Sequence, residues 1–326
     1  MNFKKIILFA SSLCAFELFA QNFDIEQTAQ LIRPRFRTES RYTFDSRFTD
    51  TAGLYNCFEN AAGITFPIKR KFKTDISLNL SSLKLKDIFK NSIRIKAYEI
   101  LGSIKVSNKQ LFLGFDSVKH RSVHYAAAGL TGLHLTKKYR IFFYSVNGII
   151  HEEQSVISKF SPRLSSVIGQ YHIRGLRKSF YYGFSMIYSD KLFVPIPFIG
   201  GSEPINNQFS FHYLLPVQVS LQYKQKNTFI IVGSKLDGQR FGINYGNIKS
   251  NLSYINAGAF VNFRHRFSKT FQIQIESGYL YYQNIRFDDA YKQINKYPLS
   301  NSFYVQFNLN VFLGKSLLEK IVDQVF

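Results

Sequence analysis

The sequence predicts an all-β protein, a closed antiparallel transmembrane β-barrel of about 14 strands. Apolar and polar residues alternate with period two over long segments, and the polar faces of these segments carry rows of charges or amides. The apolar faces are rich in aromatic residues, with 34 Phe and 20 Tyr among 326 residues. Such two-faced segments are typical of membrane barrels, with lipid outside and water inside. A soluble β-sandwich or barrel, which also alternates, is the alternative.

Residues 1–20 have the pattern of a secretory signal peptide. Lys4 and Lys5 precede an apolar run at residues 6–16, and Ala20 closes the segment with a small residue. Because this run is too short to span a bilayer, we expect cleavage after Ala20 and export from the cytoplasm. Residues 21–32 are then a lead-in, and residues 33–313 form the barrel.

The first and last barrel segments carry the clearest alternation, and we expect them to pair and close the sheet. In residues 303–313 every second side chain is apolar, beginning with Phe303, and amides fill most positions between. Residues 35–48 alternate in the same way over fourteen positions. Their polar face predicts a row of charges inside the lumen, formed by Arg35, Arg37, Glu39, Arg41, Asp45 and Arg47. Such a row can set ion selectivity, or it can form an ion-paired network that fills the lumen.

Short polar turns give the strand count. They are predicted near Arg70, Ser107, Lys138, Gly175, Gln225 and Phe267. Six tight hairpins supply twelve strands, and the first and last segments add two, which makes fourteen. Twelve and sixteen remain alternatives. Both termini then lie on the side of the short turns, which in bacterial barrels faces the periplasm.

Positive charge concentrates in these turns. The chain has 42 Lys and Arg against 21 Asp and Glu, a net charge of +21. The predicted basic rim consists of Lys69, Arg70, Lys71, Lys73, Lys105, Lys109, Lys137, Lys138, Arg140, Arg174, Arg177, Lys178, Lys224, Lys226, Arg264, Arg266 and Lys269. It can contact anionic lipid headgroups, dock an acidic periplasmic partner, or attract anions to the pore. Nucleic acid is not an expected partner, because the chain is exported and carries no nucleic-acid motif.

Longer connections are predicted at residues 49–57, 84–91, 151–161, 190–207, 236–251 and 284–300. One of them contains an apolar, proline-rich run at residues 192–201. Its prolines disfavour an interior strand, and its apolar residues disfavour free exposure to water. We therefore expect this loop to pack at the barrel mouth or to act as a gate through Phe193, Pro195, Pro197 and Phe198.

The tail at residues 314–326 differs from the rest of the chain. Its apolar residues recur at helical spacing, and Ser316 with Glu319 has the capping-box pattern. An amphipathic C-terminal helix is predicted there.

Several short motifs resemble a known family. They are DKLFVPIPFIGG at residues 190–201, LLP at 214–216, SKLDGQRFGIN at 234–244 and GKSLL after the last strand. This pattern is similar to a family of Gram-negative outer-membrane β-barrels known only as a domain of unknown function. The resemblance implies the barrel and its compartment, and it brings no catalytic or binding residue.

The sequence carries no motif for phosphate, dinucleotide or zinc chemistry. His120 and His124 are four residues apart and could lie on the same face of a strand, but no carboxylate near them completes a metal site. A lipid hydrolase would need a serine and a histidine to meet at the wall, and Ser166, His124, His134 and His172 supply these residue types. We expect neither cofactor nor metal and no catalytic residue.

The expected function is therefore that of a non-catalytic pore or a small-solute transport or binding barrel in the outer membrane of a Gram-negative bacterium. The solute is anionic if the lumen arginines dominate, and apolar if residues 192–199 form the gate. The alternative is a structural or assembly component of the envelope that docks through its basic periplasmic rim. An outer-membrane lipid-modifying enzyme is the less favoured third hypothesis.

Overall fold

The computed structural model describes residues 33–76, 93–136, 140–159, 162–174, 178–189, 192–245, 248–288 and 294–314. The signal peptide and lead-in predicted for residues 1–32 lie outside this part of the chain, as does the predicted helix apart from Gly314. No helix in the described ranges is long and apolar enough to cross a membrane.

The described residues form fifteen strands and a short 3₁₀ helix. They are β1 (Arg35–Arg47), β2 (Leu54–Ile76), β3 (Ile93–Leu113), β4 (His120–Thr136), β5 (Arg140–Glu153), η3 (Gln154–Lys159), β6 (Arg163–Ile173), β7 (Ser179–Ser189), β8 (Leu192–Pro204), β9 (Phe209–Leu215), β10 (Gln218–Gln225), β11 (Thr228–Tyr245), β12 (Ile248–Arg266), β13 (Phe271–Asp288), β14 (Ile294–Leu299) and β15 (Ser302–Phe312).

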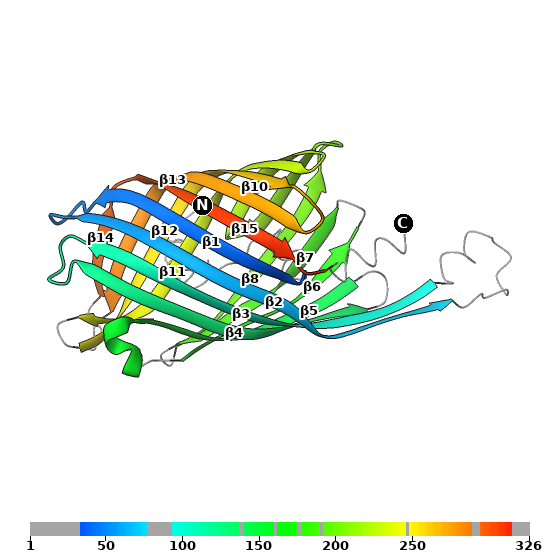
Figure 1. The fold of residues 1–326 in the computed structure, drawn as a ribbon, viewed down its shortest axis with the longest axis horizontal. Coiled ribbons are helices and arrows are strands. Elements are labelled where there is room, and N and C mark those ends of the chain that lie inside the picture. The colour runs from blue at the N-terminus through cyan, green and yellow to red at the C-terminus, as the bar shows by residue number, and fades with distance from the viewer. Residues whose placement is uncertain are drawn as a thin grey trace, which may run out of the picture.

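The strands close into one antiparallel barrel (Figure 1). Each strand from β1 to β13 pairs with the next, β13 pairs with β15, and β15 returns to β1. The short β14 extends the edge of β15 along β13, so fourteen strands make up the wall. The predicted fold class is confirmed.

The predicted closure of the barrel by its first and last segments is also confirmed. Strands β1 and β15 pair from Arg35 opposite Phe312 to Thr43 opposite Tyr304. The two faces of β15 separate as period two requires, because Phe303 is 58% exposed on the outside and Asn308 is 0% exposed inside. Phe and Tyr side chains on the outer faces of many strands form the apolar surface that a barrel presents to lipid.

Two of the six predicted turns are wrong. Arg70 lies within β2, opposite Glu99 of β3, and Ser107 lies in the middle of β3, opposite Ala61. The wet lumen explains the error, since polar residues are tolerated in the middle of a strand when they point inward. The predicted turns at Gln225 and Phe267 fall at or beside the described connections 226–227 and 267–270, whereas Lys138 and Gly175 lie outside the described residues, between β4 and β5 and between β6 and β7.

Two further connections lie at the same end as these turns and restore the count of fourteen, although the sequence analysis placed residues 84–91 and 190–207 in longer connections on the opposite, outer side. Residues 77–92 join β2 to β3, and residues 205–208 join β8 to β9. We call the end where β1 begins and β15 finishes the terminal end, and the opposite one the far end. Strands β2 and β3 project beyond their neighbours at the terminal end, at the right of Figure 1.

The wall is uneven in height. Strand β2 has 23 residues, whereas β9 has 7 and β10 has 8. At the far end β11 reaches across to β5, where Gly242 bridges to Glu152. This contact therefore bypasses β6 to β10 at the far end.

Candidate functional site

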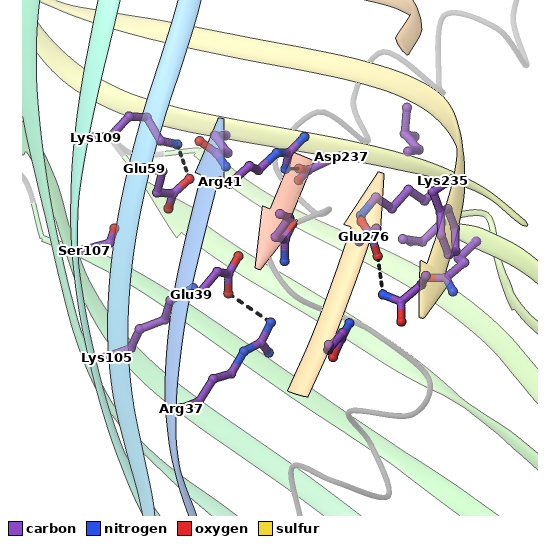
Figure 2. A pocket seen from close by; sticks show the side chains of 18 of the residues that line it. Arg37, Glu39, Arg41, Glu59, Lys105, Ser107, Lys109, Lys235, Asp237 and Glu276 are labelled. Atoms are coloured by element: carbon purple, nitrogen blue, oxygen red, sulfur yellow. Dashed lines mark hydrogen bonds and ion pairs between the residues drawn. The ribbon is translucent and has the colours of Figure 1, made fainter. Parts of the chain in front are cut away.

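The inner face of β1 leads into a polar layer at the middle of the barrel. Arg37, Glu39 and Arg41 point inward and line a cavity of about 120 Å³. Figure 2 shows them facing charged side chains from the other strands across this cavity. Arg35 is also buried on the inner face, nearer the terminal end, and it does not line the cavity.

Two members of the predicted lumen row lie elsewhere. The pairing of β1 with β2 shifts register between Thr43 and Ser46, which inserts a β-bulge. A bulge adds one residue to a strand and so reverses which side chains face inward. Ser46 is consequently buried, while Asp45 and Arg47 are exposed, and Asp45 accepts a hydrogen bond from Asn56. The predicted row therefore ends at Arg41.

Ion pairs dominate the polar layer, one within β1 and three between strands (Figure 2). They join Arg37 to Glu39 at 2.9 Å, Arg41 to Asp237 at 2.9 Å, Lys109 to Glu59 at 3.1 Å and Lys235 to Glu276 at 2.5 Å. The predicted alternative of an ion-paired network thus describes the row on β1. The sequence did not predict the acidic and basic partners of this row, which lie on β2, β3, β11 and β13.

The cavity lining retains an excess of positive charge. It contains six Lys and Arg side chains against four Asp and Glu side chains. Within the described residues, no carboxylate lies in ion-pair contact with Lys105, whose ammonium group lies 5.7 Å from the centroid of the Tyr125 ring. The predicted rim cations Lys105, Lys109 and Arg264 therefore belong to the lumen, because they sit on inward-facing positions of β3 and β12.

The rest of the rim keeps its cations at the terminal end. Arg140, Arg174, Lys224, Lys226 and Lys269 are exposed in or beside the terminal connections. Lys178, also exposed, pairs with Glu203 at 2.7 Å. Residues 137, 138 and 177 of the predicted rim lie outside the described ranges, and the side chain of Lys73 is likewise not described.

Apolar residues close the lumen on the far side of the polar layer. Side chains from β2, β3 and β4 meet those from β11, β12 and β13 across the barrel. The rings of Tyr55 and Tyr254 lie 5.1 Å apart, and those of Phe115 and Phe287 lie 5.8 Å apart. Small barrels are commonly filled by side chains in this way. Among the described residues, these apolar side chains therefore stand between the cavity and the far end.

A second apolar cluster lies toward the terminal end. It includes Phe143, Tyr181, Phe198 and Leu214 from the inner faces of β5, β7, β8 and β9. The inner face of β3 runs from Ala97 in this cluster, past Lys105 and Lys109, to Leu111 in the far cluster. The polar cavity therefore lies between two apolar layers.

The proline-rich segment is not a loop. Residues 192–204 form β8, which pairs with β7 along its length. Phe198 is buried inside, whereas Pro195 and Pro197 are exposed, and the side chain of Phe193 is not described. Proline is compatible with this strand because Pro195 and Pro197 precede Ile199, the first residue of β8 that pairs with β9, and so lie at a strand edge. The predicted mouth loop is therefore corrected to a wall strand.

The residue types considered for lipid hydrolysis do not meet. Ser166 of β6 stands opposite Val146 and Met186, and His172 lies six positions along the same strand. His124 and His134 are on β4, which is separated from β6 by β5. Among the described residues, no group of three His, Cys, Asp or Glu side chains is placed to hold a metal ion.

A closed antiparallel barrel with an apolar exterior and a charged interior defines the class of this protein. No family model matches the chain, and no curated protein does. The predicted resemblance to an outer-membrane family therefore stays a prediction.

Solved structures give distant matches. The toluene transporter TodX of Pseudomonas putida aligns at TM-score 0.42 and 9% identity, covering 88% of this chain and 92% of TodX. The transport unit of the autotransporter AIDA-I from Escherichia coli aligns at TM-score 0.36 and 6% identity, covering 94% and 97%. Omp33 of Acinetobacter baumannii aligns at 0.33 and 8%, covering 86% and 99%. Because these TM-scores are all below 0.5, we infer no function from the matches, and the fold is assigned from the strand pairing alone.

Proposed function

We propose that this chain is an outer-membrane β-barrel of a Gram-negative bacterium that binds and transports small anionic solutes in its lumen without catalysis. The cavity with its cationic excess is the observation that carries the proposal. A small anion placed there would gain charge-assisted hydrogen bonds from Lys or Arg donors in a setting where salt screens little.

Lys105 is the residue best placed to hold such an anion. Its neighbours Arg41, Lys109 and Lys235 each have a carboxylate partner, so their charges are already balanced. The ammonium group of Lys105 lines the same cavity beside the ring of Tyr125. Because an anion there would not have to displace a carboxylate, we assign Lys105 as the principal donor.

Benzoate binding to the detergent-solubilised barrel, measured by equilibrium dialysis, tests the proposal. Lys105→Gln should weaken binding by about 10- to 150-fold, because a hydrogen bond to a charged group contributes roughly 1.5–3 kcal/mol. The matched control is Lys226→Gln, which removes an exposed lysine from the turn between β10 and β11 and should leave binding unchanged. Equal binding by the parent protein and Lys105→Gln, or no binding by either, would overturn the proposed function.

A further inference from the structure

Three rings form a platform on the outer face of the barrel near its terminal end. The imidazole of His172 on β6 stacks on the ring of Tyr182 on β7, with centroids 5.6 Å apart, and lies 6.2 Å from the ring of Phe180. The rings of Phe180 and Tyr182 are 5.8 Å apart. The platform faces outward, because Tyr182 is 42% exposed whereas its neighbour Tyr181 is 1% exposed on the inner face. Aromatic rings at this level of a barrel are typical of the border between hydrocarbon and headgroups.

Two arginines flank this ring platform on its terminal side. The guanidinium carbon of Arg174, which directly follows β6, lies 4.9 Å from the centroid of the Phe180 ring. Arg140, the first residue of β5, stands opposite His172 in the strand register. Arg140 and Arg174 are therefore diagonal neighbours on one face, which are roughly 7–8 Å apart. Both are exposed, and two guanidinium groups at this spacing can donate hydrogen bonds to one phosphate from two sides.

The surroundings hold these arginines in place and keep the surface positive. The backbone N–H of Arg174 donates to the Lys178 carbonyl at 2.9 Å, which draws the ends of β6 and β7 together. The carboxylate of Glu203 on β8 is already paired with the Lys178 ammonium group at 2.7 Å. Its negative charge is therefore balanced by that lysine, and the outer surface at Arg140 and Arg174 is suited to an anion.

An apolar row continues from the platform toward the middle of the barrel. Tyr144, Ile168 and Phe184 stand opposite one another on β5, β6 and β7, and they are 39%, 40% and 53% exposed. Ile168 is four residues from His172, which corresponds to about 13 Å along the strand. Cations, aromatic rings and apolar side chains thus follow one another in the order of the headgroup, interface and acyl chains of a phospholipid.

We propose that Arg140, Arg174 and the ring platform form a binding site for an anionic glycerophospholipid in the leaflet at the terminal end. The two guanidinium groups hold the headgroup phosphate, and the acyl chains lie along the row of Ile168 and Phe184. Charge complementarity selects the headgroup, because the ammonium group of a zwitterionic lipid is repelled by the two arginines, whereas the glycerol of phosphatidylglycerol is uncharged. The site lies on the outside of the wall and does not depend on anion binding in the lumen.

Tryptophan quenching by brominated lipids tests this site, because the chain contains no Trp. Ile168→Trp places a reporter below the headgroup site, and Phe184→Trp serves if that variant does not fold. Val261→Trp is the comparison on β12, where Val261 is 51% exposed. Ile168 and Val261 each stand five residues before the last residue of their strands. The full-length variants are reconstituted in phosphatidylcholine vesicles that contain increasing fractions of phosphatidylglycerol, with either lipid brominated on its acyl chains.

We expect phosphatidylglycerol to be preferred over phosphatidylcholine more than fivefold at Ile168→Trp, and Val261→Trp to show no such preference. Adding Arg174→Gln should lower the preference about fivefold, and Arg140→Gln should act in the same direction. The matched control Lys269→Gln removes an exposed cation from the turn between β12 and β13 and should leave it unchanged.

Three outcomes would overturn the proposal. They are an equal preference at the two reporters, a loss in Lys269→Gln as large as that in Arg174→Gln, and a preference that survives when both arginines are replaced. Any of these results would mean that the positive charge of the terminal end attracts anionic lipid in general, without a site on β5, β6 and β7. Benzoate binding in the lumen is measured separately, so the proposed function stands or fails independently of this result.

Discussion

The carboxylate of Glu276 gathers three donors in the lumen, so its removal gives a sharp test of the polar layer. The Lys235 ammonium lies 2.5 Å from Oε1, and the Tyr304 hydroxyl donates to the same oxygen at 2.8 Å. The Asn262 amide donates to Oε2 at 2.7 Å. The Glu276 side chain is only 7% exposed, and that of Lys235 is 20% exposed.

Glu276→Ala should destabilise the barrel by about 3 kcal/mol. Breaking a buried ion pair costs about 3–5 kcal/mol because the remaining charge loses its partner, and the partial exposure of Lys235 places the value at the lower end. Glu276→Gln retains an oxygen acceptor and should cost less, about 1.5–3 kcal/mol. Removing both charges in Glu276→Leu with Lys235→Met should recover most of the loss, since an apolar pair of similar volume often replaces a buried ion pair without cost.

Unfolding in urea, followed by the gel mobility of the folded barrel in vesicles, measures these differences. Glu203→Ala is the matched control, because Glu203 pairs with Lys178 while both side chains are about 40% exposed, and such surface pairs contribute roughly 0–1 kcal/mol. If Glu276→Ala cost no more than Glu203→Ala, or if the double variant were no more stable than the single one, the polar layer would not be the buried ion-paired network inferred above.

Two further outcomes test the wall and the far end. Phe307 is 43% exposed on the outer face, and Phe307→Arg should destabilise the barrel by about 2–4 kcal/mol in vesicle folding titrations if the residue lies near the bilayer midplane. The control Phe267→Arg, in the terminal turn, should cost about 0–1 kcal/mol. Equal costs for the two variants would contradict the outward assignment of Phe307. Replacing both Tyr55 and Tyr254 by Ala should open the far apolar cluster and raise the ion conductance in planar bilayers, whereas Phe303→Ala should not; unchanged conductance in the folded double variant would show that this cluster is not the barrier.

The wall could be predicted from the sequence because its cause is local. Successive side chains of a strand point to opposite faces, so a strand with lipid outside and water inside has apolar and polar residues that alternate with a period of two. That pattern located β1 and β15 and their closure, with Arg35 opposite Phe312. It also assigned Phe36 and Phe307 to the outer surface, where both are exposed.

The polar layer could be predicted only in part, because its contacts are not local. Arg41 and Asp237 are 196 positions apart, and no pattern near either residue points to the other. Lys105 and Lys109 have the composition of a turn, and only the register of β3 between β2 and β4 shows that they face the lumen. The bulge after Thr43 leaves no compositional sign either, so the faces of Asp45 and Arg47 were assigned from an unbroken period.

The proline-rich segment shows how a correct physical rule led to a wrong structure. Pro195 and Pro197 disfavour an interior strand, and in a barrel without edges that rule leaves only a loop. Here the wall does have an edge, because the β9–β10 hairpin ends below residues 192–198. The prolines therefore satisfy the rule by lying on that edge. It follows that two prolines spaced by two within an alternating barrel segment are compatible with a wall strand as well as with a loop, and the lengths of the neighbouring hairpins decide between the two structures.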